Sequence, residues 1–107
     1  IEKWLNENSI EYTKEHSYLD LLGNKLGKLR FDFFIEKHNL LIEYDGQQHF
    51  KPIKQFGGEE YLKQLIIHDN TKNEYAITNK INLLRISYSE IKNINWILTN
   101  EFKKHNK

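Results

Sequence analysis

Residues 29–50, LRFDFFIEKHNLLIEYDGQQHF, decide how the rest of this chain is interpreted. Apolar side chains dominate residues 29–35 and residues 40–45, and the polar residues 36–39 separate the two runs. Short runs that are rich in Phe, Tyr and Ile and bounded by polar residues are typical of β-strands. The stretch therefore predicts two antiparallel strands joined by a tight turn.

Three carboxylates, Asp32, Glu43 and Asp45, interrupt these apolar runs. If residues 36–39 form the turn, the register places Asp32 opposite Glu43, with their Cβ atoms about 5 Å apart. Asp45 then lies on the same face as Glu43, roughly 7 Å along the strand. Strands that only build a core gain nothing from three carboxylates, so the hairpin is also a candidate site.

Carboxylates this close repel one another, and a shared proton, a basic partner or a cation relieves the repulsion. A cluster of oxygen ligands suits Mg²⁺, with Mn²⁺ as a substitute, so we predict a metal site formed by Asp32, Glu43 and Asp45. Gly46 lets the backbone turn sharply after the second strand, which brings His49 back over the cluster as a general acid or base. The other histidines are expected at the surface: His16, His38, His68 and His105.

A hairpin with one solvated face is the alternative explanation for the three carboxylates. Phe31, Phe33, Leu40 and Ile42 already supply a set of core-facing side chains, so the acids would then lie on the wet face. Divalent cations separate the two interpretations, because a solvated face predicts no metal-dependent stabilisation.

The remaining residues predict a mixed α/β domain. The expected elements are a helix over 1–8, a strand over 10–14, an irregular turn region over 18–28, a loop over 51–58 that holds Pro52, a helix over 59–79, a buried strand over 81–87 and a helix over 89–104. We therefore expect one central mixed sheet flanked by helices, in the order α-β-β-β-α-β-α.

Both long helices have an apolar stripe. In the last helix the stripe comprises Ile91, Ile94, Leu98 and Phe102. In the helix over 59–79 it comprises Leu62, Leu65, Ile66 and Ala76, and the polar residues on the same stripe are Asp69, Lys72 and Asn73. Polar residues in such a stripe either form a satisfied buried pair, here Asp69 with Lys72, or face an active site.

Composition narrows the class of protein. The chain has 107 residues, which suits a single domain over residues 1–107, and no apolar run approaches membrane length. It has no cysteine, so disulfides and thiolate metal sites are excluded and a reducing, cytoplasmic setting is expected. It has no methionine either, so we expect a fragment of a larger protein. The net charge of +1 neither demands nor excludes nucleic acid.

The hairpin motif resembles the core of the PD-(D/E)xK nucleases. Asp32, ten further residues and then Glu43-x-Asp45 repeat the spacing of that core, but Phe31 stands where Pro often precedes the Asp and Asp45 stands where the catalytic Lys is expected. The segments FDFF, LLIEYDGQQHF and HDNTKNEYAITNKINLLRISY look like the very-short-patch-repair-like endonucleases. The match is to phage-type homing endonucleases of the EDxHD group, which use a histidine instead of the lysine, and it covers roughly residues 10–88.

This resemblance implies roles for several residues. The candidate catalytic residues are Asp32, His49, Asp45, Asp69, Glu2 and Lys72. Asp32 resembles the family's metal-binding aspartate and His49 its catalytic histidine, while Asp45 and Asp69 are both candidates for the remaining acidic position. Lys72 is a candidate contact for a phosphate.

The family also has a glutamate in its first helix. Glu2 is the best candidate for that position, Glu7 is an alternative, and a third alternative is that the residue lies before the start of this chain.

The function implied by the resemblance is a metal-dependent DNA endonuclease with a restriction-endonuclease-like fold, the catalytic domain of a homing endonuclease. Mg²⁺ held by Asp32 would polarise the phosphoryl oxygen, and His49 would activate the attacking water. The expected partner is double-stranded DNA, with no membrane, a separate DNA-binding domain in the full-length protein, and a bacterial host cytoplasm if a phage encodes it. The alternatives are a mismatch-type repair nickase, a catalytically inactive nuclease-fold module that binds DNA or protein, and an unrelated structural α/β domain.

Overall fold

The computed structural model describes residues 1–23, 27–51, 54 and 57–105, and it has an α+β fold. The helices and strands are α1 (Glu2–Glu7), β1 (Thr13–Gly23), β2 (Gly27–Ile35), β3 (Leu40–Asp45), α2 (Gly58–Thr78), β4 (Asn82–Ser87) and α3 (Ile94–His105). Short 3₁₀ turns, η1 (Glu36–His38), η2 (Gln47–His49) and η4 (Tyr88–Asn93), follow β2, β3 and β4. The expected mixed sheet flanked by helices is confirmed.

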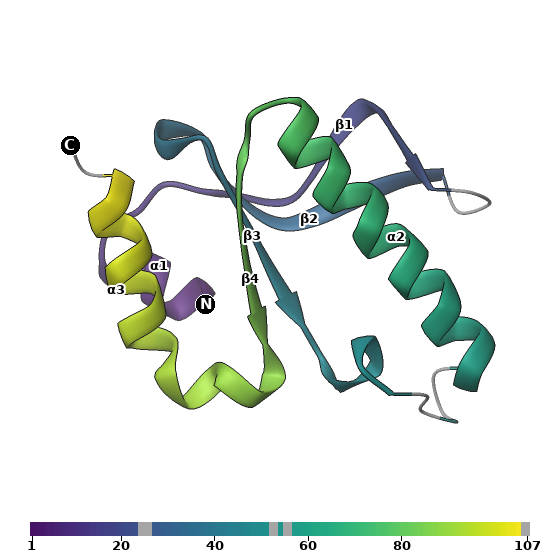
Figure 1. Cartoon of the computed structure of the whole chain (residues 1–107). Helices are drawn as coiled ribbons and strands as arrows, with labels where there is room; N and C mark the ends of the chain where they lie inside the picture. The colour runs from purple at the N-terminus through teal and green to yellow at the C-terminus, as the bar shows by residue number, and fades with distance from the viewer. Residues whose placement is uncertain (24–26, 52–53, 55–56, 106–107) are drawn as a thin grey trace.

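The strands of the described residues form one sheet in the order β1-β2-β3-β4. β1 pairs with β2 and β2 with β3 in antiparallel fashion, whereas β4 runs parallel to β3. A parallel neighbour requires a crossover, and α2 supplies it by returning the chain to the start of β4 (Figure 1). Because β3 and β4 are parallel, their carboxyl ends lie at the same edge of the sheet.

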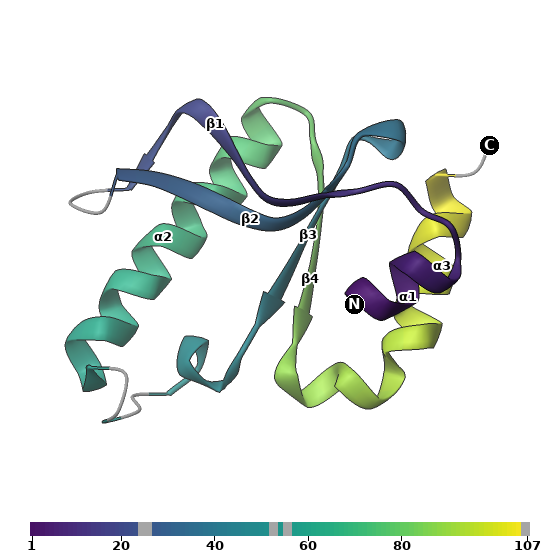
Figure 2. The ribbon, with the colours of Figure 1, turned by 180° about the vertical axis from the view of Figure 1, so that it is seen from behind.

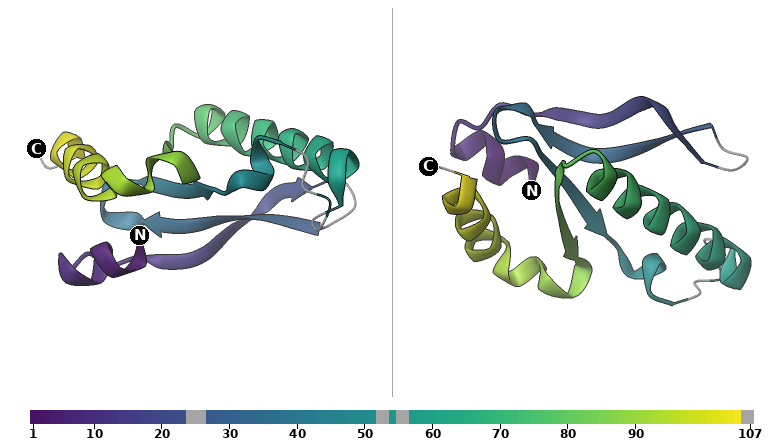
Figure 3. Two further views of the ribbon diagram at one scale, coloured as in Figure 1. Left: turned by 90° about the horizontal axis from the view of Figure 1, so that it is seen from below. Right: turned by 45° about the horizontal axis from the view of Figure 1, so that its top comes forward.

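Helices cover both faces of this sheet. Leu40 and Ile42 of β3 pack with Leu5 of α1 and with Leu98 and Phe102 of α3. Leu41 points to the other face, and the cluster around it includes Tyr75 of α2. Figures 1 and 2 accordingly show α2 on one side of β3 and β4, with α1 and α3 on the other, and Figure 3 shows the strong twist of the strands between them.

The predicted hairpin is confirmed. β3 has the expected bounds, β2 begins two residues earlier than expected, and Ile35 pairs with Leu40 as the four-residue turn requires. The turn consists of η1 followed by Asn39, whose φ of 50° is left-handed. Asn tolerates this conformation better than most residues, so the sequence of the turn fits its backbone.

The predicted irregular region over 18–28 is wrong, because most of it is strand. β1 runs to Gly23, β2 starts at Gly27, and these two glycines are the last pair of the β1–β2 ladder. Residues 24–26 between them lie outside the described residues. The register of the ladder shifts between Ser17 and Leu22, so an irregular pairing, rather than the absence of a strand, accounts for the weak strand pattern.

Two further expectations require correction. The strand over 81–87 is not buried throughout, since β4 is an edge of the sheet and only Ile86 has no exposed surface. The last helix begins at Ile94, because residues 88–93 form η4 after a capping box at Ser87, and this leaves Ile91 exposed. Leu98 and Phe102 are buried as predicted.

α2 begins at Gly58, the last residue of the predicted loop over 51–58, and most of the other residues of that prediction lie outside the described ones. Pro52 lies outside the described residues. None of the helices in the described ranges combines the length and the apolar character that a membrane crossing requires.

Candidate metal centre

The backbone ladder between β2 and β3 changes at Asp32. The paired residues run from Ile35–Leu40 to Phe33–Ile42. At the next position, side-chain carboxylates accept the hydrogen bonds in place of backbone carbonyls. The Asp32 backbone N–H donates to Glu43 Oε1 at 2.7 Å, and the Tyr44 backbone N–H donates to Asp32 Oδ2 at 2.7 Å. Both carboxylates therefore replace backbone acceptors where the two strands part.

Strict alternation of faces also fails at Asp32. Phe31 and Phe34 belong to the cluster on the α2 side of the sheet, whereas Phe33 and Ile35 pack on the α1 and α3 side. Phe31 is thus not part of the same core-facing set as Phe33, Leu40 and Ile42. The change of face at Asp32 coincides with the end of the β2–β3 ladder at the Phe33–Ile42 pair.

Glu43 is almost completely buried, with 3% of its surface exposed. Its Oε2 lies 2.9 Å from Lys72 Nζ, and its Oε1 accepts the Asp32 N–H described above. Burial raises the pKa of the Glu43 carboxyl, the nearby Lys72 charge opposes that rise, and the Asp32 charge adds to it. Both oxygens of Glu43 are therefore already engaged by partners of the chain itself.

A second group brings together three side chains from three elements. Asp45 ends β3, His49 ends η2, and Asp69 lies on α2, and their ligand atoms all lie within 4.8 Å of one another. His49 Nδ1 is 2.9 Å from Asp69 Oδ2 and 3.7 Å from Asp45 Oδ1. We use the name metal centre for the candidate group Asp45, His49 and Asp69, because its two carboxylates are oxygen ligands of the kind that Mg²⁺ or Mn²⁺ prefers. The imidazole nitrogen is a softer donor beside them.

The chain reaches this centre by a 3₁₀ turn. His49 N–H donates to the carbonyl of Gly46 at 3.1 Å, which closes η2 and directs the imidazole back towards the end of β3. Gly46 has φ −72° and ψ 176°, which is ordinary extended backbone. The predicted return of His49 is present, but it does not depend on a left-handed glycine.

The hydrogen bond with Asp69 raises the pKa of His49 above the usual value for histidine. The charges of Asp69 and Asp45 act in the same direction, while burial and the charge of Arg85 oppose them. The short contact to Asp69 uses Nδ1, which leaves Nε2 of the neutral imidazole as an acceptor.

Arg85 on β4 is the residue that the sequence interpretation missed. Its NH1 lies 2.8 Å from Asp45 Oδ1, its Nε donates to Asn73 Oδ1 at 2.8 Å, and its NH2 donates to the carbonyl of Asp69 at 3.2 Å. Arg85 is also the residue paired with Glu43 in the parallel β3–β4 ladder. The available signal was a single charged residue inside the apolar run INLLRIS.

Comparisons of this chain with protein-family models, curated proteins and solved structures found no match.

The structure arranges the predicted metal ligands differently from the sequence interpretation. Asp45 belongs to the metal centre, but Glu43 is engaged by Lys72, and Asp32 accepts a hydrogen bond from the Tyr44 backbone. Asp45 and Asp69 were the two candidates for the remaining acidic position. The structure brings both of them to the metal centre.

The polar residues of the α2 stripe face the sheet. That they face an active site stays a prediction. Asp69 and Lys72 do not form the predicted buried pair; each has its own partner, His49 for Asp69 and Glu43 for Lys72. Ile66 does not share the stripe, since 46% of its surface is exposed. The buried side of α2 therefore carries Asp69 to the metal centre and Lys72 to the neighbouring Glu43.

Glu2 belongs to a different group. Its carboxylate accepts a hydrogen bond from the Tyr12 hydroxyl at 2.7 Å and lies 3.3 Å from Lys14 Nζ. The hydrogen bond from Tyr12 and the one from Lys14 lower the pKa of Glu2. The alternative residue, Glu7, pairs with Lys3 at 3.8 Å. Neither glutamate contacts the metal centre in the described part of the chain.

The histidines expected at the surface are more buried than predicted. His68 is buried on α2, and its Nε2 has no hydrogen-bond partner among the described residues. The half-buried histidines are His16, His38 and His105. His16 stacks on Phe34, with ring centroids 4.5 Å apart.

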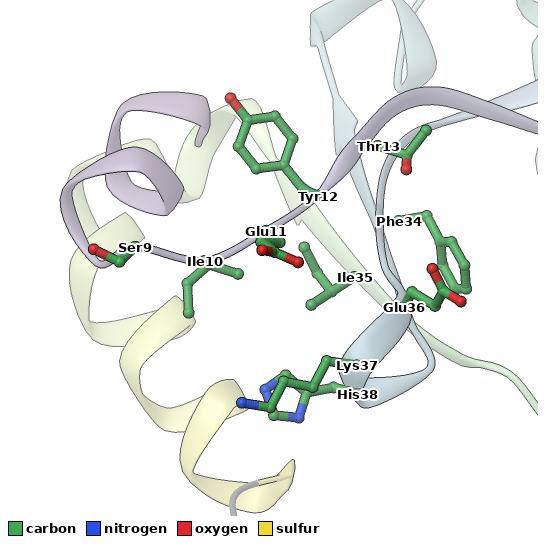
Figure 4. Close-up of a pocket in the computed structure, with 10 residues that line it drawn as sticks. All are labelled: Ser9, Ile10, Glu11, Tyr12, Thr13, Phe34, Ile35, Glu36, Lys37 and His38. Carbon is green, nitrogen blue, oxygen red and sulfur yellow. The ribbon is translucent and has the colours of Figure 1, made fainter.

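A cavity of about 790 Å³ lies at the other end of the hairpin (Figure 4). Residues 9–13 and residues 34–38 line it, next to the turn that precedes β3. The metal centre is at the opposite, carboxyl end of β3, so this cavity is separate from it.

Proposed function

We propose that this chain is a metal-dependent nuclease domain that hydrolyses phosphodiester bonds in double-stranded DNA, as the catalytic domains of homing endonucleases do. The observation that carries the proposal is the convergence of Asp45, His49 and Asp69 from β3, η2 and α2 at the carboxyl edge of the sheet. The resemblance of the hairpin motif to the EDxHD nucleases points to the same reaction.

Asp45 and Asp69 would supply the carboxylate ligands for a divalent ion. When bound, the ion would supply Lewis-acid polarisation of the phosphoryl oxygen and charge stabilisation of the leaving 3′-oxygen. His49 accepts a proton from the attacking water at Nε2, and Asp69 fixes the imidazole by holding Nδ1 at 2.9 Å. Asp69 is therefore both a ligand candidate and the residue that sets the tautomer of His49.

Two exposed aromatic side chains beside the centre support a nucleic acid as the substrate. Phe50 follows His49 directly and is 55% exposed, and Tyr88 follows Ser87, which pairs with Asp45 across the β3–β4 ladder. The two rings lie 5.7 Å apart. Exposed aromatic side chains suit stacking on nucleobases that are unpaired at the cleavage site.

One observation favours a catalytically inactive nuclease-fold module as the second candidate. Lys72 and Arg85 already supply cationic partners for Glu43 and Asp45, so the acids are compensated without an added ion. Incubation of the protein with supercoiled plasmid DNA, in Mg²⁺ or in EDTA, separates the two functions. Nicked or linear DNA that forms only in Mg²⁺ supports the nuclease, whereas intact plasmid in both conditions supports the inactive module.

Millimolar Mg²⁺ or Mn²⁺ should raise the melting temperature of the protein, because the ion binds the folded centre and not the unfolded chain. An ion present at a hundredfold excess over its dissociation constant adds about 2.7 kcal/mol of stability. Asp45→Asn and Asp69→Asn should each remove most of this shift, as measured by differential scanning fluorimetry. Glu36→Gln is the control, because Glu36 is an exposed acid at the other end of β3. An equal shift in all four proteins would place the ion elsewhere.

Phe50→Ala and Tyr88→Ala should weaken DNA binding by about 1–3 kcal/mol for each unpaired base that no longer stacks on an aromatic ring. The measurement is fluorescence anisotropy in EDTA with a labelled duplex that contains a short unpaired segment. Trp96→Ala is the matched control, because Trp96 is a more exposed aromatic side chain on α3. If Trp96→Ala weakens binding as much as Phe50→Ala does, the substrate does not lie over the strand ends.

A further inference from the structure

We propose that Arg85 takes the place of a second cation at the carboxylate cluster, so that the metal centre binds one divalent ion and Arg85 sets the affinity for it. This inference rests on the proposed function, since it requires that the centre binds a metal at all. The inference goes beyond the proposed function in stating how many ions bind and which residue limits that number.

The guanidinium of Arg85 occupies the position that a second cation would take. Its NH1 lies between the three acids on the α2 side of the sheet, at 2.8 Å from Asp45 Oδ1, 3.6 Å from Asp69 Oδ1 and 4.0 Å from Glu43 Oε2. A guanidinium so placed makes the electrostatic contacts that a bridging cation would make. An ion coordinated by Asp45 and Asp69 must therefore bind within a few ångströms of a fixed positive charge, which lowers its affinity.

The net charge of the cluster favours binding of a single divalent ion. Its carboxylates are Asp32, Glu43, Asp45 and Asp69, and its permanent cations are Lys72 and Arg85. With all four acids ionised, these groups sum to −2. One divalent ion brings the sum to zero, and a second would leave an uncompensated +2 in a largely buried site, which is unfavourable.

Arg85 also holds the centre together. Its Nε bond to Asn73 and its NH2 bond to the carbonyl of Asp69 attach α2 to the edge strand β4. Removal of Arg85 should therefore lower the stability of the fold while raising the affinity for the ion. The two effects distinguish the charge of Arg85 from its role in packing. If Arg85 only positioned the ligands, its removal would lower both the stability of the fold and the affinity for the ion.

Isothermal titration calorimetry of the metal-free protein with Mn²⁺ tests the inference. The parent should bind one ion. Arg85→Gln should bind the first ion about tenfold or more tightly, since a charge a few ångströms away has been removed, and should melt at a lower temperature. Arg85→Lys loses the planar guanidinium but keeps the positive charge. Because the charge is retained, the affinity of this variant for Mn²⁺ should stay within about threefold of the parent. Lys3→Gln, an equal change of net charge at an exposed position on α1, is the control and should bind as the parent does.

Several results would overturn the inference. Binding of two ions by the parent, weaker or unchanged binding by Arg85→Gln, or tighter binding by Arg85→Lys would each do so, while leaving the proposed function in place. If the parent binds no ion, the proposed function and the inference both fail. If Arg85→Gln does not fold, the stoichiometry of the parent and the affinity of Arg85→Lys still decide.

Discussion

Lys72→Met should lower the free energy of unfolding at neutral pH by about 3–5 kcal/mol, the typical cost of leaving a buried charge without its partner. Lys72 Nζ is 2.9 Å from Glu43 Oε2, and the side chains of both residues are largely buried. Arg85 cannot replace it, because its NH1 lies 4.0 Å from Glu43 and is held by Asp45. The measurement is urea unfolding followed by circular dichroism.

The pH dependence of this loss identifies its cause. Burial raises the pKa of Glu43, and without Lys72 it rises further, so the folded variant binds a proton more readily than the unfolded chain does. The destabilisation should therefore be largest at neutral pH and shrink as the pH falls through the raised pKa, where Glu43 becomes neutral. A loss that does not depend on pH would mean that packing of the Lys72 stem, and not the charge, is responsible.

Two further variants complete the test. Lys63→Met makes the same substitution on the same helix, but the Lys63–Glu60 pair is exposed at 3.7 Å, so it should cost less than about 1 kcal/mol. Glu43→Gln combined with Lys72→Met removes both charges and should recover most of the stability lost in Lys72→Met alone.

The hairpin could be predicted from the sequence because its determinants are local. The apolar runs, the polar turn at 36–39 and the alternation of β3 are all contained within residues 29–50, and the Ile35–Leu40 pair follows from the length of the turn. The face of α2 that carries Asp69 and Lys72 followed from helical spacing for the same reason.

The metal centre could be predicted only in part, because its partners come from distant segments. Nothing in the sequence states that β4 lies parallel to β3, so Arg85 could not be placed opposite Glu43. Without Arg85 and Lys72 in place, a metal ion was the remaining way to relieve repulsion between the acids of the hairpin. The structure shows that Glu43 is compensated by Lys72, and that the donor group instead combines Asp45 with His49 and Asp69.

The full extent of β1 could not be predicted from its own residues, because it depends on pairing with β2. Gly23 and Gly27 are typical of loops, but here they pair with each other at the end of a long ladder. Tertiary contacts with β2 and with α2, including Tyr18 against Tyr75 at 5.0 Å, support a strand whose own residues predict it weakly.

His49→Ala should lower the rate of DNA cleavage by about 10²–10⁴-fold, the usual effect of removing a general base. The fold should remain intact, because the side chain lies at the end of η2 and not in either apolar cluster. The measurement is the initial rate of plasmid nicking at saturating Mg²⁺. The matched control is His105→Ala, which removes a histidine that also pairs with a carboxylate, Glu101 at 2.7 Å, but lies on α3. Cleavage by His49→Ala at the parental rate would exclude His49 as the base.

The raised pKa of His49 gives a second, metal-free readout of the same arrangement. The hydrogen bond to Asp69 raises the pKa, so NMR titration of the metal-free protein should place it above the ordinary value of about 6.5, and Asp69→Asn should lower it. A raised pKa means that the folded state binds the proton more tightly than the unfolded chain does. The stability contributed by protonated His49 is therefore fully present at acid pH, below the pKa of the unfolded chain, and is lost as the pH rises through the folded pKa. The difference in melting temperature between the parent and His49→Ala should shrink over that range. If Asp69→Asn leaves the His49 pKa unchanged, Asp69 does not orient the imidazole, and the proposed tautomer with Nε2 as the proton acceptor loses its support.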